Sequence, residues 1–424
     1  MNKTTDYPKF TQIKQKFSLH KVKDINKTIK SELTKLKLHD RIKSGNTVAV
    51  TAGSRGITEI KTITRIIIDE LIKLGGKPFI IPAMGSHGGA TAKGQINVLT
   101  GYGITEETMG VPIKSSMGVT RIGESREGIP VYADKNALTA DHIVVINRVK
   151  SHTRFIGKVE SGLIKMLMVG LGKDTGAKIY HRAIMKYSFD QITASVLPVI
   201  QSKLPVLFGL AIIENAFGEV AEIQAVPGED FINVEPKLKN YSFEMMAKLP
   251  FRDIDLLIVD EMGKDISGTG MDTNVIGRRD ESLIEDIRIA RIFVRDLTPQ
   301  SHGNACGIGL ADFTTKKLVD KIMTKETYIN CLTALRPEGA KIPMTFNCDK
   351  DAFAAAISTC GVDDPQKTRI VWVKNTLNLE KAIVSEAFLD EIKGSENLDQ
   401  ISPVKELVFD CSGNLPLFDE WTPR

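Results

Sequence analysis

The residues best suited to chemistry lie in one stretch of the chain, 141–182. His152 precedes Lys165 by thirteen residues, and His181 follows Lys165 by sixteen. Lys165 stands within the apolar segment 162–172, where an ammonium group is costly unless it is paired, reaches solvent or is chemically converted. Because the whole chain has only seven histidines, this grouping indicates a chemical site.

Three interpretations of Lys165 are open at this point. Its side chain can extend to solvent from an amphipathic helix, or the segment can be a strand with that position facing outward. Alternatively, a lysine with a lowered pKa can act as a nucleophile that forms a Schiff base or an amide to a cofactor. A bulky ligand could approach the backbone here, because glycines flank the segment at Gly157, Gly162, Gly170, Gly172 and Gly176.

Two further candidates lie in other loops. His87 follows an apolar run in the sequence PAMGSHGGA, where backbone N–H groups suit an anion and an imidazole suits a general base. The alternative is a turn histidine bonded to the backbone. Arg55, in AGSRGI, suits bidentate capture of a carboxylate or phosphate, or else makes a surface salt bridge.

Two common sites are excluded by spacing. The segment GLGKDTGAK does not match a Walker A loop. No two histidines have the spacing of a zinc site on one helix. A bound metal would therefore take few ligands from the protein and the others from an organic cofactor.

A repeated unit of apolar strand, polar loop and amphipathic helix must position these residues. Helical patterns are expected at 59–74 and from Thr91 onward. In open sheets of such units, ligands bind at the carboxyl ends of the strands, where Ser54, His87, His152 and Lys264 stand. The strands are expected at Thr47–Thr51, Pro78–Pro82, His142–Ile146, Leu207–Ile213, Asp255–Val259, Arg291–Val294 and Arg369–Val373.

This pattern predicts an α/β protein of two α/β domains, with mixed or parallel sheets flanked by helices and the active site in the crevice between the domains. A length of 424 residues exceeds one ordinary core. The segment 240–252 resembles a helix that ends at a proline before a new strand. We therefore expect a catalytic and cofactor-binding domain at 1–245 and a second α/β domain at 246–424.

Composition narrows the class of protein. A net charge of +4, with 42% hydrophobic and 25% charged residues, is typical of a globular protein. The basic N-terminal region has helical spacing and reads as a solvated helix face, so we expect no nucleic-acid partner. No apolar run reaches the ~18 residues of a membrane span, and no signal peptide is evident. Five scattered cysteines fit a reducing cytoplasm.

The ordered set of motifs resembles the lactate racemase family, whose members carry a nickel pincer nucleotide. The resemblance rests on GSRG at 53–56, GSHGG at 85–89, KSH at 150–152, the Lys165 segment and His181. It is clearest over about residues 45–185 and extends to the GKDISG loop at 263–268. It implies a racemase or epimerase of a 2-hydroxy acid, with hydride transfer to and from the cofactor.

The resemblance also implies roles for single residues. Lys165 would hold the cofactor, pyridinium-3,5-bisthiocarboxylic acid mononucleotide, and His181 would ligate nickel. His87 and His152 would be the acid/base pair beside the substrate. Further contacts are expected from Arg55 and Lys264 to the substrate and from Ser54, Gly88 and Gly89 to the cofactor. Cofactor-synthesis enzymes would be partners, and a homo-oligomer is compatible with this assignment.

The chain also departs from the family pattern. The run at 52–55 lacks the acidic residue that the family carries there, and the gap from His152 to Lys165 is about three residues longer than in the lactate enzyme. A 2-hydroxy acid other than lactate is therefore the expected substrate. In the GKDISGTGMD loop, Asp265 or Asp272 could serve instead of Lys264. Two other hypotheses stay open: a Schiff-base lyase or aldolase, and a non-catalytic nucleotide- or anion-binding protein.

Overall fold

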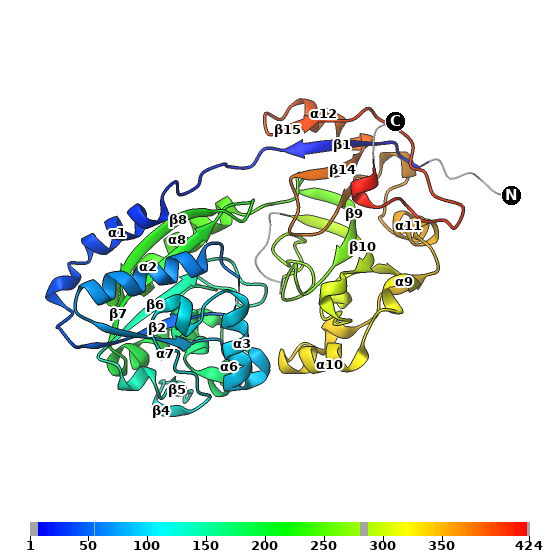
Figure 1. The fold of residues 1–424 in the computed structure, drawn as a ribbon. Coiled ribbons are helices and arrows are strands. Elements are labelled where there is room, and N and C mark those ends of the chain that lie inside the picture. Colours follow the sequence, from blue (N-terminus) through cyan, green and yellow to red (C-terminus); the bar gives the residue numbers. More distant parts are fainter. Residues whose placement is uncertain (1–6, 55, 280–286, 422–424) are drawn as a thin grey trace. The chain divides into compact units, whose positions relative to one another are not determined.

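The computed structural model describes residues 7–54, 56–279 and 287–421. The chain forms two compact units. We call Ser18–Met246 the N-terminal unit, and Met1–Phe17 with Ala247–Arg424 the C-terminal unit. The predicted fold class, two α/β units with mixed sheets flanked by helices, is confirmed (Figure 1).

The first strand departs from the expected domain at 1–245. Strand β1 (Phe10–Gln15) pairs antiparallel with β14 (Lys381–Ser385) and β15 (Leu398–Gln400) of the C-terminal unit. Phe10 is fully buried in the core of that unit. The start of the chain therefore belongs with its end, because β1 finds its hydrogen-bond partners and its apolar contacts there.

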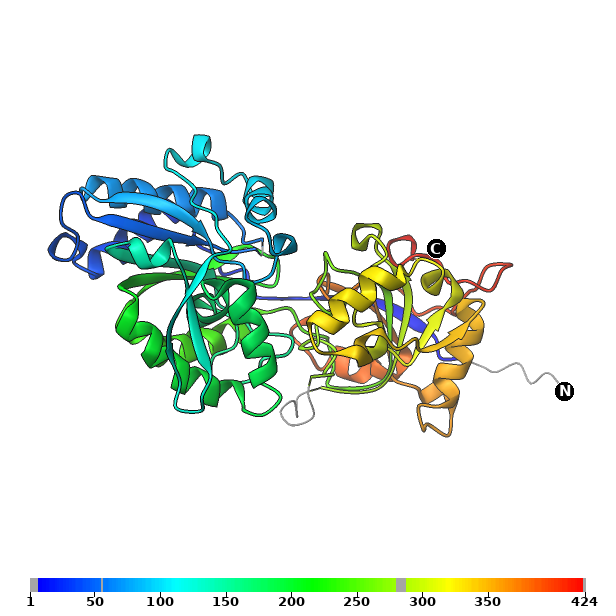
Figure 2. The ribbon, with the colours of Figure 1, turned by 90° about the horizontal axis from the view of Figure 1, so that it is seen from below.

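The N-terminal unit is built on a five-stranded sheet of order β3-β2-β6-β7-β8. Four strands run parallel, and β8 is antiparallel to β7. Figure 2 follows this order by colour, from the blue strands β2 and β3 to the green strands β7 and β8. The strands are β2 (Thr47–Ala52), β3 (Lys77–Pro82), β6 (His142–Arg148), β7 (Val206–Glu214) and β8 (Val220–Pro227).

Both faces of this sheet are covered, because its strands are nearly continuously apolar and successive side chains point to opposite faces. Val48 and Val50 of β2 pack in a core with α1 and α2, whereas Ala49 packs in a second core with α5 to α8. The helices are α1 (Ile25–Lys35), α2 (Ile60–Lys73), α3 (Ala92–Gly101), α4 (Glu106–Met109), α5 (Leu163–Lys165), α6 (Lys173–Ala183), α7 (Phe189–Lys203) and α8 (Phe231–Met245).

Two parts of this unit differ from the repeated strand–loop–helix pattern. The loop ENAFGE is followed by strand β8, which forms an antiparallel hairpin with β7, and not by a helix. A separate hairpin joins β4 (Val119–Glu124) to β5 (Pro130–Asp134). Of the basic N-terminal residues, Lys27 and Lys30 lie on α1, whereas Lys14 lies on strand β1.

The C-terminal unit has an eight-stranded mixed sheet of order β12-β11-β10-β9-β13-β14-β1-β15. Its core includes Trp372 and Phe353. Within the ranges described above, no helix is long and apolar enough to cross a membrane. The remaining elements are β9 (Asp253–Met262), β10 (Arg288–Leu297), β11 (Phe313–Thr315), α9 (Lys316–Val319), α10 (Thr324–Thr333), β12 (Met344–Phe346), α11 (Asp349–Ser358), β13 (Ile370–Val373) and α12 (Leu389–Lys393).

Candidate functional site

The topology of the N-terminal unit marks one edge of its sheet for a ligand. The chain leaves β2 through α2 to pair β3 on one side, and it leaves β6 through α5 to α7 to pair β7 on the other side. The carboxyl ends of β2 and β6 therefore form a topological switch point, where open α/β sheets bind ligands. The loops that carry Ser54 and His152 both begin there.

Lys165 lies on a helix at this switch point. It ends the short helix α5, and a π-helical turn, Met166–Gly170, follows it. Such turns are rare and occur often at functional sites. A Cβ on Gly53, just after β2, would lie 3.1 Å from the Met166 Cε atom, so the turn packs against the end of that strand.

The apolar neighbours of Lys165 are buried, but Lys165 itself is only half-buried. The helix interpretation of this segment is confirmed, and the strand interpretation is wrong. The Lys165 ammonium lies 5.1 Å from the centre of the Phe155 ring. It therefore keeps some access to solvent while one side of it faces an aromatic ring.

Phe155 gathers three of the predicted residues around one buried ring. It stacks on His152 with ring centroids 4.5 Å apart and planes at 13°. His181 lies at 5.4 Å from the same ring, and Phe189 stacks on it at 4.6 Å. Sequence reasoning missed Phe155, because a single aromatic residue in a polar loop gives no sign of what packs against it.

The backbone fixes the orientation and the tautomer of His152. Its Nδ1 atom accepts hydrogen bonds from the backbone N–H groups of Arg154, at 3.0 Å, and Phe155, at 2.9 Å. An Nδ1 that accepts two hydrogen bonds carries no proton, so the geometry assigns the proton to Nε2. His152 can therefore donate through Nε2 to a bound molecule.

His181 is a neutral imidazole in the last turn of α6. Burial, together with the positive charges of Arg154 and Lys165, lowers the pKa of His181 to about 4. Metal binding requires the neutral form. No group of three or more His, Cys, Asp or Glu side chains placed to hold a metal occurs in the ranges described above. A metal at His181 would thus take other ligands from elsewhere.

His87 belongs to a second cluster, whose loop packs against the π-helical turn. Its Nδ1 forms a hydrogen bond with the Ser54 hydroxyl, and the Ser54 carbonyl accepts one from Tyr102 at 2.8 Å. A Cβ on Gly85, at the start of the His87 loop, would lie 3.3 Å from the Val169 Cγ1 atom. The two clusters therefore border the same turn.

The two glycines after His87 play different parts. Both have positive φ, +67° at Gly88 and +65° at Gly89. A Cβ on Gly88 would lie 2.6 Å from the backbone of Gly94, so this glycine permits close packing of the loop on α3. A Cβ on Gly89 would meet nothing within 4 Å.

The most deeply buried lysine in this region is Lys173 rather than Lys165. Its ammonium lies 2.8 Å from the Asp134 carboxylate, and both side chains are 0% exposed. Burial lowers the pKa of Lys173, and Asp134 opposes that shift. Lys173 also donates to Gln95, which in turn donates to the backbone carbonyl of Gly85. This network ties the first residue of α6 to the His87 loop.

The described residues do not decide the two predicted substrate contacts. Arg55 lies outside the described residues. Lys264 lies in the C-terminal unit, where its ammonium donates to Asn330 at 2.6 Å and to the carbonyl of Gly268. Asp265 accepts from the Thr298 hydroxyl at 2.6 Å in the same unit. The roles of Arg55 and Lys264, and an active site between the domains, stay predictions.

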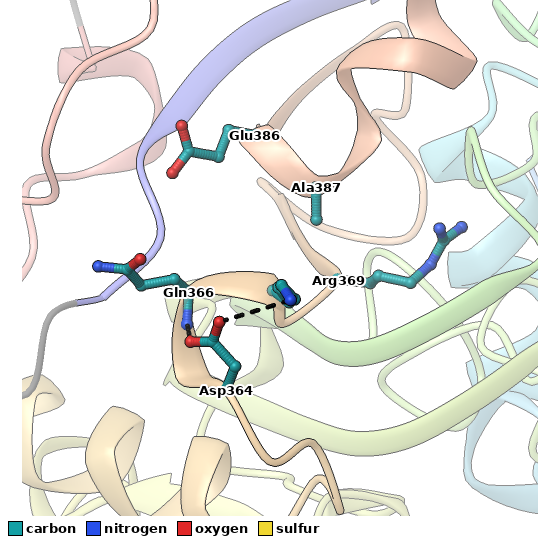
Figure 3. A pocket seen from close by; sticks show the side chains of 6 residues that line it. Asp364, Gln366, Arg369, Glu386 and Ala387 are labelled. Carbon is teal, nitrogen blue, oxygen red and sulfur yellow. Dashed lines mark hydrogen bonds and ion pairs between the residues drawn. The ribbon is translucent and has the colours of Figure 1, made fainter.

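A pocket in the C-terminal unit contains none of the predicted site residues. Figure 3 shows its charged side chains, and the lining residues are Asp364, Gln366, Lys367, Arg369, Glu386 and Ala387. Arg369 pairs with Glu391 at 2.7 Å, and Lys367 lies 3.8 Å from Asp364. Arg369 and Lys367 thus already have charged partners, and the switch point remains the candidate site.

Comparison with known proteins identifies a domain in the first half of the chain. Residues 7–191 match the model of the lactate racemase N-terminal domain. These residues thus form a divergent lactate racemase N-terminal domain. No curated protein matches the sequence.

Two solved structures are similar to this chain. A protein of Thermotoga maritima has a TM-score of 0.51 and 14% identity, over 83% of this chain and 97% of that one. The lactate racemase apoprotein of Thermoanaerobacterium thermosaccharolyticum has a TM-score of 0.48 and 11% identity, over 86% of this chain and 85% of that one. The first of these supports the fold. The lactate racemase domain match itself includes Ser54, His87, His152, Lys165 and His181 and leaves Lys264 outside.

Proposed function

We propose that the chain is a racemase or epimerase of a 2-hydroxy acid that works with a nickel pincer nucleotide. The match to the lactate racemase N-terminal domain supports an isomerase in general. The observation that carries the finer proposal is the grouping of Lys165, His152 and His181 around Phe155. Two histidines and one accessible amine at a switch point suit a tethered cofactor.

The residues present fit this cofactor. Lys165 offers a half-buried amine beside an aromatic face, which suits covalent attachment of a planar ring. His181 offers a neutral imidazole to nickel. The cofactor would supply the remaining nickel ligands and, when bound, an acceptor for the hydride on the substrate Cα.

The two proposed acid/base histidines differ in their freedom to exchange protons. His152 is held with its proton on Nε2, so in this tautomer it gives a hydrogen bond to the substrate hydroxyl oxygen. To act as the base for the other enantiomer, it would have to carry its proton on Nδ1. His87 bonds through Nδ1 to a hydroxyl group, which can donate or accept. His87 can therefore change tautomer and take the proton at Nε2, which is the behaviour of a general base.

The substrate contacts are the least constrained part of the proposal. Arg55 would bind the substrate carboxylate through two hydrogen bonds. The absence of an acidic residue at 52–55 favours a 2-hydroxy acid other than lactate. Lys264 is a further candidate contact from the C-terminal unit.

Epimerisation in D₂O tests this function. Loaded enzyme is incubated with single enantiomers of a set of 2-hydroxy acids, and the product is examined for its configuration and for deuterium at Cα. Hydride transfer within the site keeps protium at Cα, whereas removal of a Cα proton exchanges it with solvent. Inverted product without deuterium supports the proposal. A lysine adduct trapped by borohydride in the presence of a carbonyl compound would instead support a Schiff-base lyase.

A further inference from the structure

Helix α8 lies outside the matched domain, yet it presents two charged side chains to the candidate site. Glu235 and Lys239 are four residues apart and so share one face of the helix. Glu235 contacts the start of the segment that carries Lys165, and Lys239 contacts the loop that carries His152. One helix face thus meets both segments.

Glu235 caps the first turn of the Lys165 helix. Its side chain is 1% exposed, and its Oε2 atom accepts the backbone N–H of Ile164 at 2.9 Å. The N-terminal residue of this turn, Gly162, has no side chain to act as a cap. A Cβ at Gly162 would overlap Glu235 Oε1, so the glycine lets the carboxyl group reach the turn.

Burial of Glu235 is costly and needs a reason. Burial raises the pKa of Glu235 to about 7, while the backbone N–H groups of Ile164 and Leu163 oppose that shift. Oε1 has no hydrogen-bond partner in the part of the chain that the structure describes. A core position that served packing alone would be filled at lower cost by an apolar residue.

Lys239 holds the His152 loop at two points. Its ammonium donates to the Gly157 carbonyl at 3.0 Å and lies 3.3 Å from the Glu160 carboxylate. Glu160 in turn accepts the backbone N–H of His152 at 2.7 Å. Because Glu160 is almost fully buried, the loss of Lys239 would leave its charge without this cation.

We propose that two positioning residues on α8 arrange the candidate site. Glu235 positions Lys165, and Lys239 positions His152. The contacts are independent of any cofactor, but the purpose of the positioning rests on the proposed function. The two residues act on different segments, so their effects separate. Removal of Glu235 disturbs the backbone under Lys165, and removal of Lys239 disturbs the His152 loop.

The first test uses the protein without cofactor. In Glu235→Ala, amide hydrogen exchange of the peptide at 162–171 should be at least tenfold faster, with the His152 tautomer unchanged. In Lys239→Met, ring ¹⁵N shifts of His152 should show a mixture of tautomers, with the exchange of 162–171 unchanged. Glu235→Gln and Lys239→Arg should restore the wild-type behaviour. Lys237→Met and Glu244→Gln, on exposed positions of α8, are matched controls.

The second test measures cofactor attachment and turnover in protein made with the cofactor-synthesis enzymes. Glu235→Ala should lower the fraction of modified Lys165 at least fivefold, whereas Lys239→Met should leave it unchanged and lower kcat per loaded enzyme at least tenfold. Equal exchange, tautomer, loading and kcat in all variants, with only the melting temperature lowered, would overturn the proposal. A wild-type protein that takes up no cofactor refutes the proposed function, while the first test still decides the positioning.

Discussion

The ring of Phe155 lies parallel to the imidazole of His152, with centroids 4.5 Å apart, and it also borders His181 and the Lys165 ammonium. Phe155→Leu keeps most of the buried volume but removes the aromatic face. We expect a loss of about 1–2 kcal/mol in the free energy of unfolding. We also expect at least a tenfold loss of kcat, because His152 loses its stacking partner.

Urea unfolding and kinetics of the loaded enzyme would measure these effects. Phe189→Leu is the matched control, since Phe189 stacks on the same ring at 4.6 Å. It should lower stability by a similar amount and leave kcat within about threefold. Equal losses of kcat in both variants would show that Phe155 contributes only packing.

The buried pair of Lys173 and Asp134 predicts a specific pattern of stability. Lys173→Met leaves the Asp134 carboxylate buried without its cation, which should cost about 3–5 kcal/mol. Adding Asp134→Asn removes the stranded charge and should recover at least half of that cost. Thermal and urea unfolding of the single and double variants measures both values. A double variant no more stable than Lys173→Met would contradict this account of the pair.

Glu235 predicts how stability depends on pH. Its pKa in the folded protein is about 7, above the ordinary value of 4.5. The folded state therefore binds this proton more tightly than the unfolded state does. The stabilisation that the proton gives is fully present below pH 4.5 and is lost as pH rises through 7. In total, the free energy of unfolding should fall by about 3 kcal/mol as Glu235 loses its proton.

Glu235→Gln has no such proton to lose. The difference in unfolding free energy between Glu235→Gln and the wild type should therefore shift in favour of the variant between pH 5 and pH 8. Unfolding measured at half-unit pH intervals checks this expectation. A difference that stays constant over that range would contradict it.

The sequence predicts four strands of the N-terminal sheet well, and it misses β8 and β1. β2, β3, β6 and β7 are nearly continuous apolar runs because helices cover both faces of the sheet. β8 escaped prediction because its turn, ENAFGE, resembles a loop before a helix, and β1 because its pairing partners lie at the other end of the chain.

The residues of the candidate site also differ in whether local sequence could predict them. The position of His152 after β6 follows from strand order, so it could be predicted from local sequence. The burial of Lys173 could not be predicted in this way, because its partner, Asp134, lies on the separate β4–β5 hairpin. Glu235 contacts Ile164 across 71 residues of sequence, and no local pattern reports such a contact.

The central claim is that Lys165 and His181 together hold a nickel-bearing cofactor. The most direct measurement is the intact mass and nickel content of the protein made with and without the cofactor-synthesis enzymes, for the wild type, Lys165→Arg and His181→Asn. We predict added mass on the Lys165 peptide and about one nickel per chain in the wild type, mass with little nickel in His181→Asn, and neither in Lys165→Arg. A wild-type protein with an unmodified Lys165 and no nickel would contradict the account.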